Sequence, residues 1–185
     1  NVNARYAKHN DQRYGGVFGL SSKYWRNAFS ANYHNKDNYN VTSAANPVTR
    51  VISTIYGERT VDFKDKLTWR PSDRLSIGAR AGYFFRETTR TVNLPERYRD
   101  FSGGLRLDWL ITKDDLQASY AFDQYDKSDY QQLRHLDIRD YSNVQNTVRL
   151  LYNHSFGETA MLTVGADYMH DYLFNTYLAG AAREQ

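Results

Sequence analysis

The sequence predicts an all-β fold, an antiparallel up-and-down sheet of about nine strands that forms a segment of a larger transmembrane β-barrel. Three observations lead to this prediction. Apolar and polar residues alternate with a period of two along most of the chain, and short polar turns alternate with longer connections. Aromatic residues (16 Tyr, 9 Phe and 3 Trp) gather near the ends of the alternating segments. Together they indicate strands that present one face to lipid and the other to water.

The alternation is clearest around Phe63. Val61, Phe63, Leu67 and Trp69 would share one face of a strand, and Asp65 is the one charged residue among them. An amphipathic helix would need apolar spacings of three and four, which this segment lacks. The same unit recurs along the chain without a domain boundary. The expected strands are 2–8, 13–21, 28–37, 55–70, 74–87, 98–111, 115–125, 143–154 and 159–174.

Connection lengths support a membrane barrel over a soluble sheet. Outer-membrane barrels have short periplasmic turns and longer extracellular loops. Their strands need about 9–11 residues to cross the bilayer, whereas strands of soluble proteins average about 5–6. The short connections are expected near 22–27, 71–74, 112–115 and 155–158, and the others near 9–12, 38–54, 88–97 and 126–142.

The aromatic residues predict two girdles around an apolar band. Trp69 and Trp109 lie beside short turns, whereas Tyr83, Tyr120 and Tyr168 lie toward the longer connections. Aromatic girdles mark the two membrane interfaces of outer-membrane barrels, although Tyr and Trp also favour strands in general. If the apolar face meets lipid, the opposite face lines a polar lumen, where mixed charges hydrate the space or hold an internal plug.

Composition excludes several classes of function. The net charge of +3 gives no strong basic field for nucleic acid. The chain has no Cys, which excludes disulfides, and its mean hydropathy of −0.76 comes with no long apolar run for a membrane helix. No HExxH, GxSxG, SxxK or phosphate-binding glycine loop occurs. We therefore expect neither an enzyme nor a resident cofactor.

One segment carries a candidate ligand site. The connection 86–100 contains Arg86, Arg90, Arg97 and Arg99 with Tyr98, and Arg90, Arg97, Tyr98 and Arg99 are the candidate ligand residues. Arginine and tyrosine side chains suit an anionic ligand such as a metal chelate or a porphyrin carboxylate. The alternative is a charged extracellular loop that binds lipopolysaccharide or nothing.

A second segment is acidic. The spacing Asp123-x-x-Asp126-x-x-Asp129 offers oxygen ligands for calcium, and Asp137 and Asp140 follow. The segment lacks the spacing and the turn glycine of an EF-hand. A calcium site is therefore the less favoured interpretation of these carboxylates, and we predict no metal site.

Two segments resemble a known family. DYSNVQNTVRLLYNH (140–154) and LTVGADYMHDYL (162–173), with the hairpin before them, resemble the middle of the barrel in TonB-dependent receptors for cobalamin, haem or ferric siderophores. The resemblance covers most of the chain and rests on these segments and on strand rhythm. It implies a 22-stranded outer-membrane barrel that encloses a plug domain, with a TonB box that couples uptake to the proton gradient.

The resemblance also implies that residues 1–185 are a partial barrel. We identify neither a plug domain nor a TonB box in the sequence, and residues 181–185 lack the terminal aromatic usual in such barrels. Nine strands would be roughly two-fifths of a 22-stranded wall, and barrels of this kind close with an even number of strands. An open sheet leaves two unpaired edges, so we expect poor stability of the isolated segment.

The functional prediction is a transport receptor of the cell outer membrane that captures a metal chelate or similar nutrient. Its expected partners are outer-membrane lipid, its own plug domain and TonB through parts outside this chain, and a small-molecule ligand, but no nucleic acid. The alternatives are a passive porin-like channel, a structural barrel that encloses a partner protein, and a soluble β-sandwich or lipocalin-like binding module.

Overall fold

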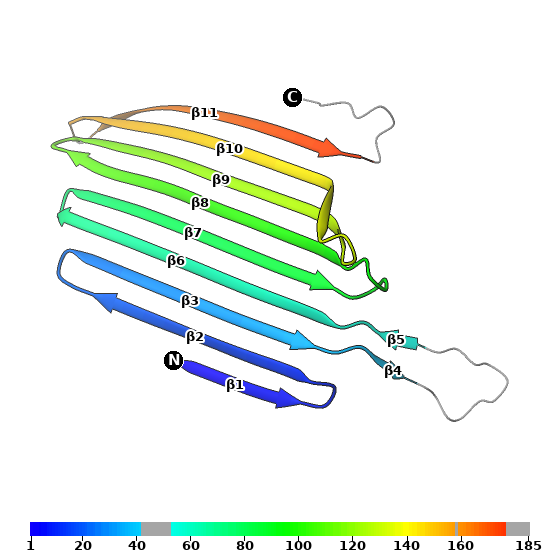
Figure 1. Ribbon diagram of the computed structural model, residues 1–185. Helices are drawn as coiled ribbons and strands as arrows, with labels where there is room; N and C mark the ends of the chain where they lie inside the picture. Colours follow the sequence, from blue (N-terminus) through cyan, green and yellow to red (C-terminus); the bar gives the residue numbers. More distant parts are fainter. Residues whose placement is uncertain (42–52, 158, 177–185) are drawn as a thin grey trace.

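The fold is a single broad antiparallel sheet with a small two-stranded ribbon at one end (Figure 1). The computed structural model describes residues 1–41, 53–157 and 159–176. Nine strands follow one another in chain order, each paired with its predecessor, in the order β1-β2-β3-β6-β7-β8-β9-β10-β11. The predicted all-β, up-and-down antiparallel architecture is confirmed.

Most strands are longer than those of typical soluble sheets. β9 has 18 residues and β10 has 21. The nine strands of the main sheet are β1 (Val2–Ala7), β2 (Asp11–Ser21), β3 (Trp25–Lys36), β6 (Glu58–Ser72), β7 (Leu75–Thr88), β8 (Glu96–Ile111), β9 (Asp114–Gln131), β10 (Leu136–Phe156) and β11 (Ala160–Asn175), and the ribbon is β4 (Tyr39–Val41) with β5 (Ser53–Ile55).

The connections lie at two opposite ends of the sheet. At the turn end, residues 22–24, 73–74 and 112–113 join successive strands. At the loop end, β3 leads into the ribbon, and residues 89–95 and 132–135 join β7 to β8 and β9 to β10. The longer connections therefore share one end, as expected from the sequence.

Two expectations about the connections were wrong. The long connection expected at 126–142 is mostly strand, because β9 continues to Gln131 and β10 begins at Leu136. The loop expected at 38–54 contains the β4–β5 ribbon. Charged side chains lie on both faces of the first segment, and the paired strands of the ribbon are only three residues long, so neither continues the alternation of the apolar face. The middle of the loop at 42–52 and the chain end at 177–185 lie outside the described residues.

The cross-strand register aligns apolar side chains into one face. Tyr33 of β3 pairs with Val61 of β6, which pairs with Phe85 of β7. Because directly paired residues share a face, this row continues across the sheet. The side chains on this apolar face include Phe18, Phe29, Phe63, Leu67, Trp69, Ile77, Tyr83, Phe101, Leu105, Leu107, Trp109, Tyr120, Val148, Leu150, Tyr152, Val164 and Tyr168.

The opposite, polar face follows from the same register. Thr68 pairs with Gly78, which pairs with Arg106, and Arg106 pairs with Ser119. Ser119 pairs in turn with Arg149. The predicted division into an apolar and a polar face is therefore present across the main sheet.

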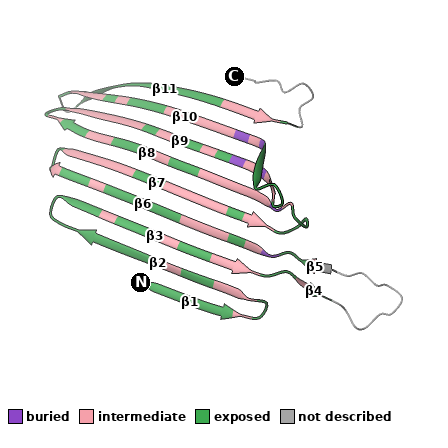
Figure 2. Cartoon of the chain, viewed as in Figure 1, coloured by how far each residue is buried: buried purple, intermediate pink, exposed green. Residues whose placement is uncertain are grey.

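The apolar face has no covering layer within the described residues, among which no hydrophobic side chain is buried. Leu105 is 58% exposed and Val164 is 55% exposed. Figure 2 shows intermediate and exposed positions along most strands, with buried residues at the loop ends of β9 and β10. No described helix is long and apolar enough to cross a bilayer.

Aromatic side chains bound the apolar face along the strand direction. On β8 the apolar stretch runs from Phe101 to Trp109, and on β6 it runs from Val61 to Trp69. These stretches of about nine residues, here called the apolar band, match the length that a tilted strand needs to cross hydrocarbon. The remaining residues of the long strands, such as Asp137 of β10, extend the sheet beyond the band at its loop end.

Candidate functional site at the loop end of the sheet

The predicted ligand residues are divided between the two faces of β8. Arg97 and Arg99 share the side that carries Leu105, whereas Tyr98 points to the polar face, because neighbouring residues of a strand alternate. Arg90 lies in the connection before β8, is exposed, and makes no ion pair within the described part of the chain. The structure therefore brings Arg97 and Arg99 together and places Tyr98 in different surroundings.

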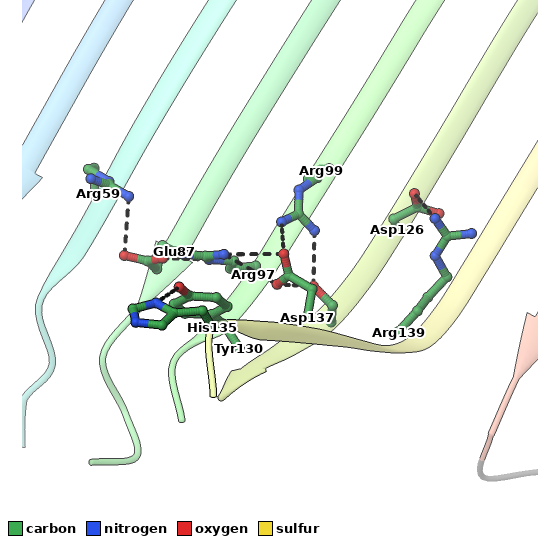
Figure 3. Close-up of polar contacts among 10 residues, drawn as sticks. Arg59, Glu87, Arg97, Arg99, Asp126, Tyr130, His135, Asp137 and Arg139 are labelled. Atoms are coloured by element: carbon green, nitrogen blue, oxygen red, sulfur yellow. Dashed lines mark hydrogen bonds and ion pairs between the residues drawn. The ribbon is translucent and has the colours of Figure 1, made fainter. Parts of the chain in front are cut away.

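Arg97 and Arg99 converge on one carboxylate (Figure 3). Arg97 Nη1 lies 3.2 Å from Asp137 Oδ2, and Arg99 Nη2 lies 2.9 Å from the same oxygen. On its other side, Arg97 Nε donates to Glu87 Oε2 at 2.6 Å. Arg99 Nη1 donates to Ser128 Oγ at 3.0 Å. This network joins β7, β8, β9 and β10, so it ties the loop ends of four strands together.

A β-bulge in β10 makes this network possible. The register shifts at Asp140, because Arg139 pairs with Ser128 and Tyr141 pairs with Lys127. Before the bulge the odd-numbered residues of β10 share the face of Arg97, and after it the even-numbered residues do. If the alternation of the rest of β10 ran unbroken through Asp140, the side chain of Asp137 would point to the polar face. The bulge therefore supplies the carboxylate that Arg97 and Arg99 share.

Burial strengthens the contacts of Arg97, whose side chain is 16% exposed. Its Cζ atom lies 3.4 Å from the centroid of the Tyr130 ring, and the Tyr130 hydroxyl lies 3.1 Å from His135 Nδ1. Burial by itself lowers the pKa of Arg97, but the hydrogen bonds and charges of Glu87 and Asp137 outweigh it and raise that pKa. Arg97 is a permanently charged group held in a fixed position.

The network extends to two further arginines at its margins. Arg59 Nη2 lies 3.4 Å from Glu87 Oε1, and Arg139 Nη2 lies 3.5 Å from Asp126 Oδ2. Asp126 is 5% exposed and also accepts hydrogen bonds from Ser142 and Gln124. Each of these two arginines makes one ion pair and remains about half exposed. The arrangement therefore links the strand ends.

The polar face has a different cluster around Tyr98. The Tyr98 hydroxyl donates to Glu96 Oε2 at 2.8 Å, and Lys127 Nζ lies 3.7 Å from Glu96 Oε1. The Arg86 Cζ atom lies 5.9 Å from the Tyr98 ring centroid, and Lys127 Nζ lies 6.0 Å from it. Burial, followed by the hydrogen bond to Glu96, raises the pKa of Tyr98 to about 12. Tyr98 is therefore a neutral hydrogen-bonding group at physiological pH.

Two further tyrosines extend this cluster along the polar face. The Tyr98 and Tyr125 ring centroids are 6.4 Å apart, and those of Tyr125 and Tyr141 are 5.9 Å apart. We call Tyr98, Tyr125 and Tyr141 the tyrosine row. The row offers aromatic faces beside the cations Arg86 and Lys127, a combination that suits planar or anionic ligands. Sequence reasoning missed both residues, because Tyr125 was expected at the end of the strand 115–125 and Tyr141 in a loop at 126–142.

The acidic segment does not assemble a metal site in the described residues. Asp123 and Asp129 face the polar side of β9, whereas Asp126 faces the opposite side. No group of three or more His, Asp or Glu side chains in the described ranges is arranged to hold a metal ion. The calcium arrangement suggested by the three-residue spacing fails because a spacing of three places neighbouring carboxylates on opposite faces of a strand.

Comparison with known proteins gives a structural likeness only. No known family matches the sequence, and no curated protein matches it. Among solved structures, a protein titled copper transporter OprC is similar, with a TM-score of 0.57 and 12% sequence identity. The likeness covers 99% of this chain and 29% of that protein. The chain thus has the fold of a part, less than a third, of a larger transport protein.

Proposed function

We propose that the chain is part of the wall of an outer-membrane β-barrel, in a receptor that imports a metal chelate or similar nutrient. The observation that carries this proposal is the continuous apolar face, which no described layer covers. A water-exposed apolar surface costs about 25 cal/mol per Å², and isolated soluble proteins rarely expose large contiguous patches. Lipid contact removes this cost without a second layer of protein.

The dimensions of the face support the same assignment. The apolar band is about nine residues long and ends in aromatic side chains, such as Phe101 and Trp109 on β8. Bilayer-crossing strands need about 9–11 residues, and aromatic residues favour both membrane interfaces. By this argument the turn end faces the periplasm and the loop end faces the outside of the cell.

Under this proposal, the tyrosine row and its cations form the ligand-contacting surface. Tyr98, Arg86 and Lys127 lie on the polar face, which becomes the inside of the barrel, at its outer mouth. Arg90 would contact ligand from the connection above them. Arg97 and Arg99 lie on the outer side, where they would position the strands that carry the row rather than touch ligand.

The substrate class is a siderophore, haem, cobalamin or another metal complex. The sequence resemblance to TonB-dependent receptors and the structural likeness to a copper transporter both support a transport role. We further propose that a plug domain fills the barrel and that TonB drives uptake, through parts outside this chain. The proposal assigns no catalytic activity.

Transport assays in the natural host test this function. A strain that lacks the gene would be supplied with a ferric siderophore, haem, cobalamin or copper, and uptake would be compared with and without TonB. We expect loss of uptake of one substrate in both mutants. The receptor assignment would be contradicted if deletion of the gene left the uptake of all four substrates unchanged. It would also be contradicted if the purified protein stayed soluble as a monomer without detergent.

Two substitutions test the ligand surface. Arg86→Ala and Tyr98→Ala should each lower the affinity for the transported substrate about fivefold, because each removes a charged or stacking contact worth about 1 kcal/mol. Arg5→Ala, at the edge strand β1, is the control and should leave affinity unchanged. Full affinity in both test variants would exclude the tyrosine row from binding.

A passive channel is the second candidate. The polar face carries many exposed charged side chains, among them Lys64, Arg80 and Arg106, which would hydrate a lumen. Planar-bilayer conductance separates the two functions. Steady conductance of the purified full-length protein favours a channel, whereas a closed barrel favours the receptor.

A further inference from the structure

A histidine on the polar face lies between two carboxylates at the loop end of the sheet. His34 of β3 pairs with Thr60 of β6, and the preceding Tyr33 belongs to the apolar row, so the His34 side chain faces the polar side. His34 Nε2 lies 2.9 Å from Asp11 Oδ1, and His34 Nδ1 lies 3.4 Å from Glu58 Oε1. All three side chains are at least three-quarters buried. We call Asp11, His34 and Glu58 the histidine cluster.

Contacts at both ring nitrogens require a protonated ring. A neutral imidazole has one N–H donor and one bare acceptor nitrogen, and an ionised carboxylate only accepts. With a neutral His34, one ring nitrogen would direct its lone pair at a carboxylate oxygen. The imidazolium form instead donates from both nitrogens. Histidine is the side chain that ordinarily changes charge between pH 5 and 8, so the contacts of this cluster depend on pH.

The double contact is particular to His34 in the described part of the chain. His154 contacts one carboxylate, and the remaining described histidines contact none. Asp11 and Glu58 approach different nitrogens of the His34 ring, so the three side chains do not converge on a single metal position. This agrees with the absence of a metal-holding group among the described residues. The cluster is therefore suited to hold a proton rather than a metal ion.

The Asp11 side of the cluster is the more firmly held. Arg13 Nε lies 3.2 Å from Asp11 Oδ1, the same oxygen that faces His34. Burial by itself raises the pKa of Asp11, but the hydrogen bonds and charges of Arg13 and His34 outweigh it and lower that pKa. Asp11 therefore keeps its charge over the range in which a histidine titrates. The contact of His34 with Glu58, which is the longer one, is the contact that loss of the proton would break.

Glu58 joins the cluster to the proposed ligand surface. Its Oε1 atom faces His34, whereas its Oε2 atom lies 3.1 Å from Arg86 Nη2. The Arg86 Cζ atom lies in turn 5.9 Å from the Tyr98 ring centroid. Lys36 of β3 is directly opposite Glu58 but forms no ion pair with the described residues. Glu58 is therefore shared between a titratable cation and a cation of the ligand surface.

We propose that His34 makes anion binding at the outer mouth dependent on pH. The protonated ring attracts Glu58 and weakens its contact with Arg86, which is then available to an anionic ligand. When His34 loses its proton to water, the bare Nδ1 repels Glu58, and the carboxylate pairs with Arg86 alone. The affinity for an anionic ligand therefore falls as pH rises. The inference rests on the proposed function in one respect, since Arg86 must belong to the ligand surface.

Binding of 1,5-naphthalenedisulfonate to the full-length protein in lipid nanodiscs tests this proposal. The probe is planar, as the tyrosine row favours, and its two sulfonates keep their charge between pH 5.5 and pH 8. Any effect of pH on its affinity therefore comes from the protein. By isothermal titration calorimetry we expect the affinity to be about fivefold higher at pH 5.5 than at pH 8, the effect of one exposed charge contact.

Two substitutions fix the charge at position 34. His34→Arg keeps a cation at every pH and should bind the probe at pH 8 as tightly as the natural protein does at pH 5.5. His34→Gln carries no charge and should bind it at pH 5.5 as weakly as the natural protein does at pH 8. His135→Gln is the matched control at the same end of the sheet. The His135 ring contacts the Tyr130 hydroxyl and no carboxylate, so this variant should keep the full pH dependence.

Glu58→Gln separates the proposed route from a direct effect of the His34 charge on the probe. Without the carboxylate, Arg86 is available at every pH. We therefore expect higher affinity at pH 8 than in the natural protein, and less than a twofold difference between the two pH values. A fivefold difference that persists in this variant would show that His34 acts directly on the probe, and it would overturn the role of Glu58.

Nuclear magnetic resonance of the histidine rings gives a readout that needs no ligand. In protein labelled with 13C-histidine, the signal that is lost in His34→Gln belongs to His34. We expect this signal to change over the same pH range as the affinity. Because binding and protonation are linked, saturating probe should move that change to higher pH. A His34 signal that stays constant from pH 5 to pH 9 overturns the proposal.

The remaining outcomes distinguish this proposal from the proposed function. Equal affinity at both pH values, or no binding at either, overturns the pH-dependent role of His34, and so does a pH effect that survives in His34→Gln. None of these results affects the transport assays. Conversely, the expected results with the probe, found together with unchanged uptake after deletion of the gene, would refute the receptor and leave the coupling between His34 and Arg86 in place.

Discussion

Replacement of Leu105 by arginine would test the assignment of the two faces. Leu105 lies at the centre of the apolar band on β8, four residues from Phe101 and four from Trp109. Its direct neighbours on the apolar face are Ala79 and Tyr120. An arginine at the bilayer midplane of a β-barrel costs about 2–4 kcal/mol.

The exposure of Leu105 separates this cost from ordinary packing loss. The side chain is already 58% exposed, so less than half of its surface is covered by protein. If the face met water, Leu105→Arg would lower the free energy of unfolding by only about 1 kcal/mol, because burial of a whole leucine side chain contributes about 1.5–3 kcal/mol. A cost of about 2–4 kcal/mol therefore indicates lipid.

Thr147→Arg is the matched control on the polar face. Val148 lies in the same row as Tyr120 on the apolar face, so the preceding residue, Thr147, faces the polar side. The direct neighbours of Thr147 are Ala121 and Met169. Both variants would be studied as the full-length protein in lipid vesicles, by equilibrium urea unfolding followed by tryptophan fluorescence. We expect the control to cost less than about 1 kcal/mol. Equal costs for the two variants would refute the face assignment.

Three further substitutions test the local structure. Asp137→Ala should lower the free energy of unfolding by about 1–3 kcal/mol, because Arg97 and Arg99 lose a shared carboxylate; an unchanged urea midpoint would count against the network. Asp65→Asn should raise it by about 1 kcal/mol, because it removes the charge from the lipid face and keeps an acceptor for Asn27 Nδ2, which lies 2.8 Å from Asp65 Oδ1; a loss of stability would argue for water there. Burial, then the charge of Asp129, raises the pKa of Asp140. Ionised Asp140 therefore destabilises the fold progressively as pH rises above the usual aspartate value. Asp140→Asn should stabilise at pH 7 but not at pH 3.5, and an equal gain at both would contradict this sign.

The main sheet could be predicted from the sequence because one face of each strand is apolar. Around Phe63 the period of two is nearly unbroken, and the turn before Leu75 carries a proline. Nine strands follow from this rhythm alone. The register between strands follows as well wherever a short turn fixes it, as between β8 and β9.

Beyond the apolar band the same reasoning fails for a physical reason. Residues 126–142 carry charged side chains on both faces. The bulge at Asp140 also shifts the alternation by one residue, so the apolar residues Leu136 and Ile138 lie on the side opposite the apolar face. The pattern of the apolar band therefore does not continue into this region.

The candidate site was predictable only in part. Arg97, Tyr98 and Arg99 were identified by residue type, and their division between two faces follows from the period of two. Their partners were not predictable, because Asp137, forty residues from Arg97, joins it only through the bulge. Tyr141 joins the tyrosine row only because β10 pairs with β9 in this region. Ion pairs between distant strands depend on register, which composition does not encode.

The central claim is that odd-numbered residues of β8 between Phe101 and Trp109 face lipid and that the even-numbered residues between them face water. The chain has no cysteine, so single-cysteine variants of the full-length protein carry one label each, provided that cysteines elsewhere are absent or replaced. A nitroxide at each position in lipid vesicles would be tested for collision with oxygen and with a water-soluble nickel complex. The account predicts strict alternation, with oxygen dominant at Leu105 and nickel dominant at Arg106. Nickel access at all nine positions would contradict it.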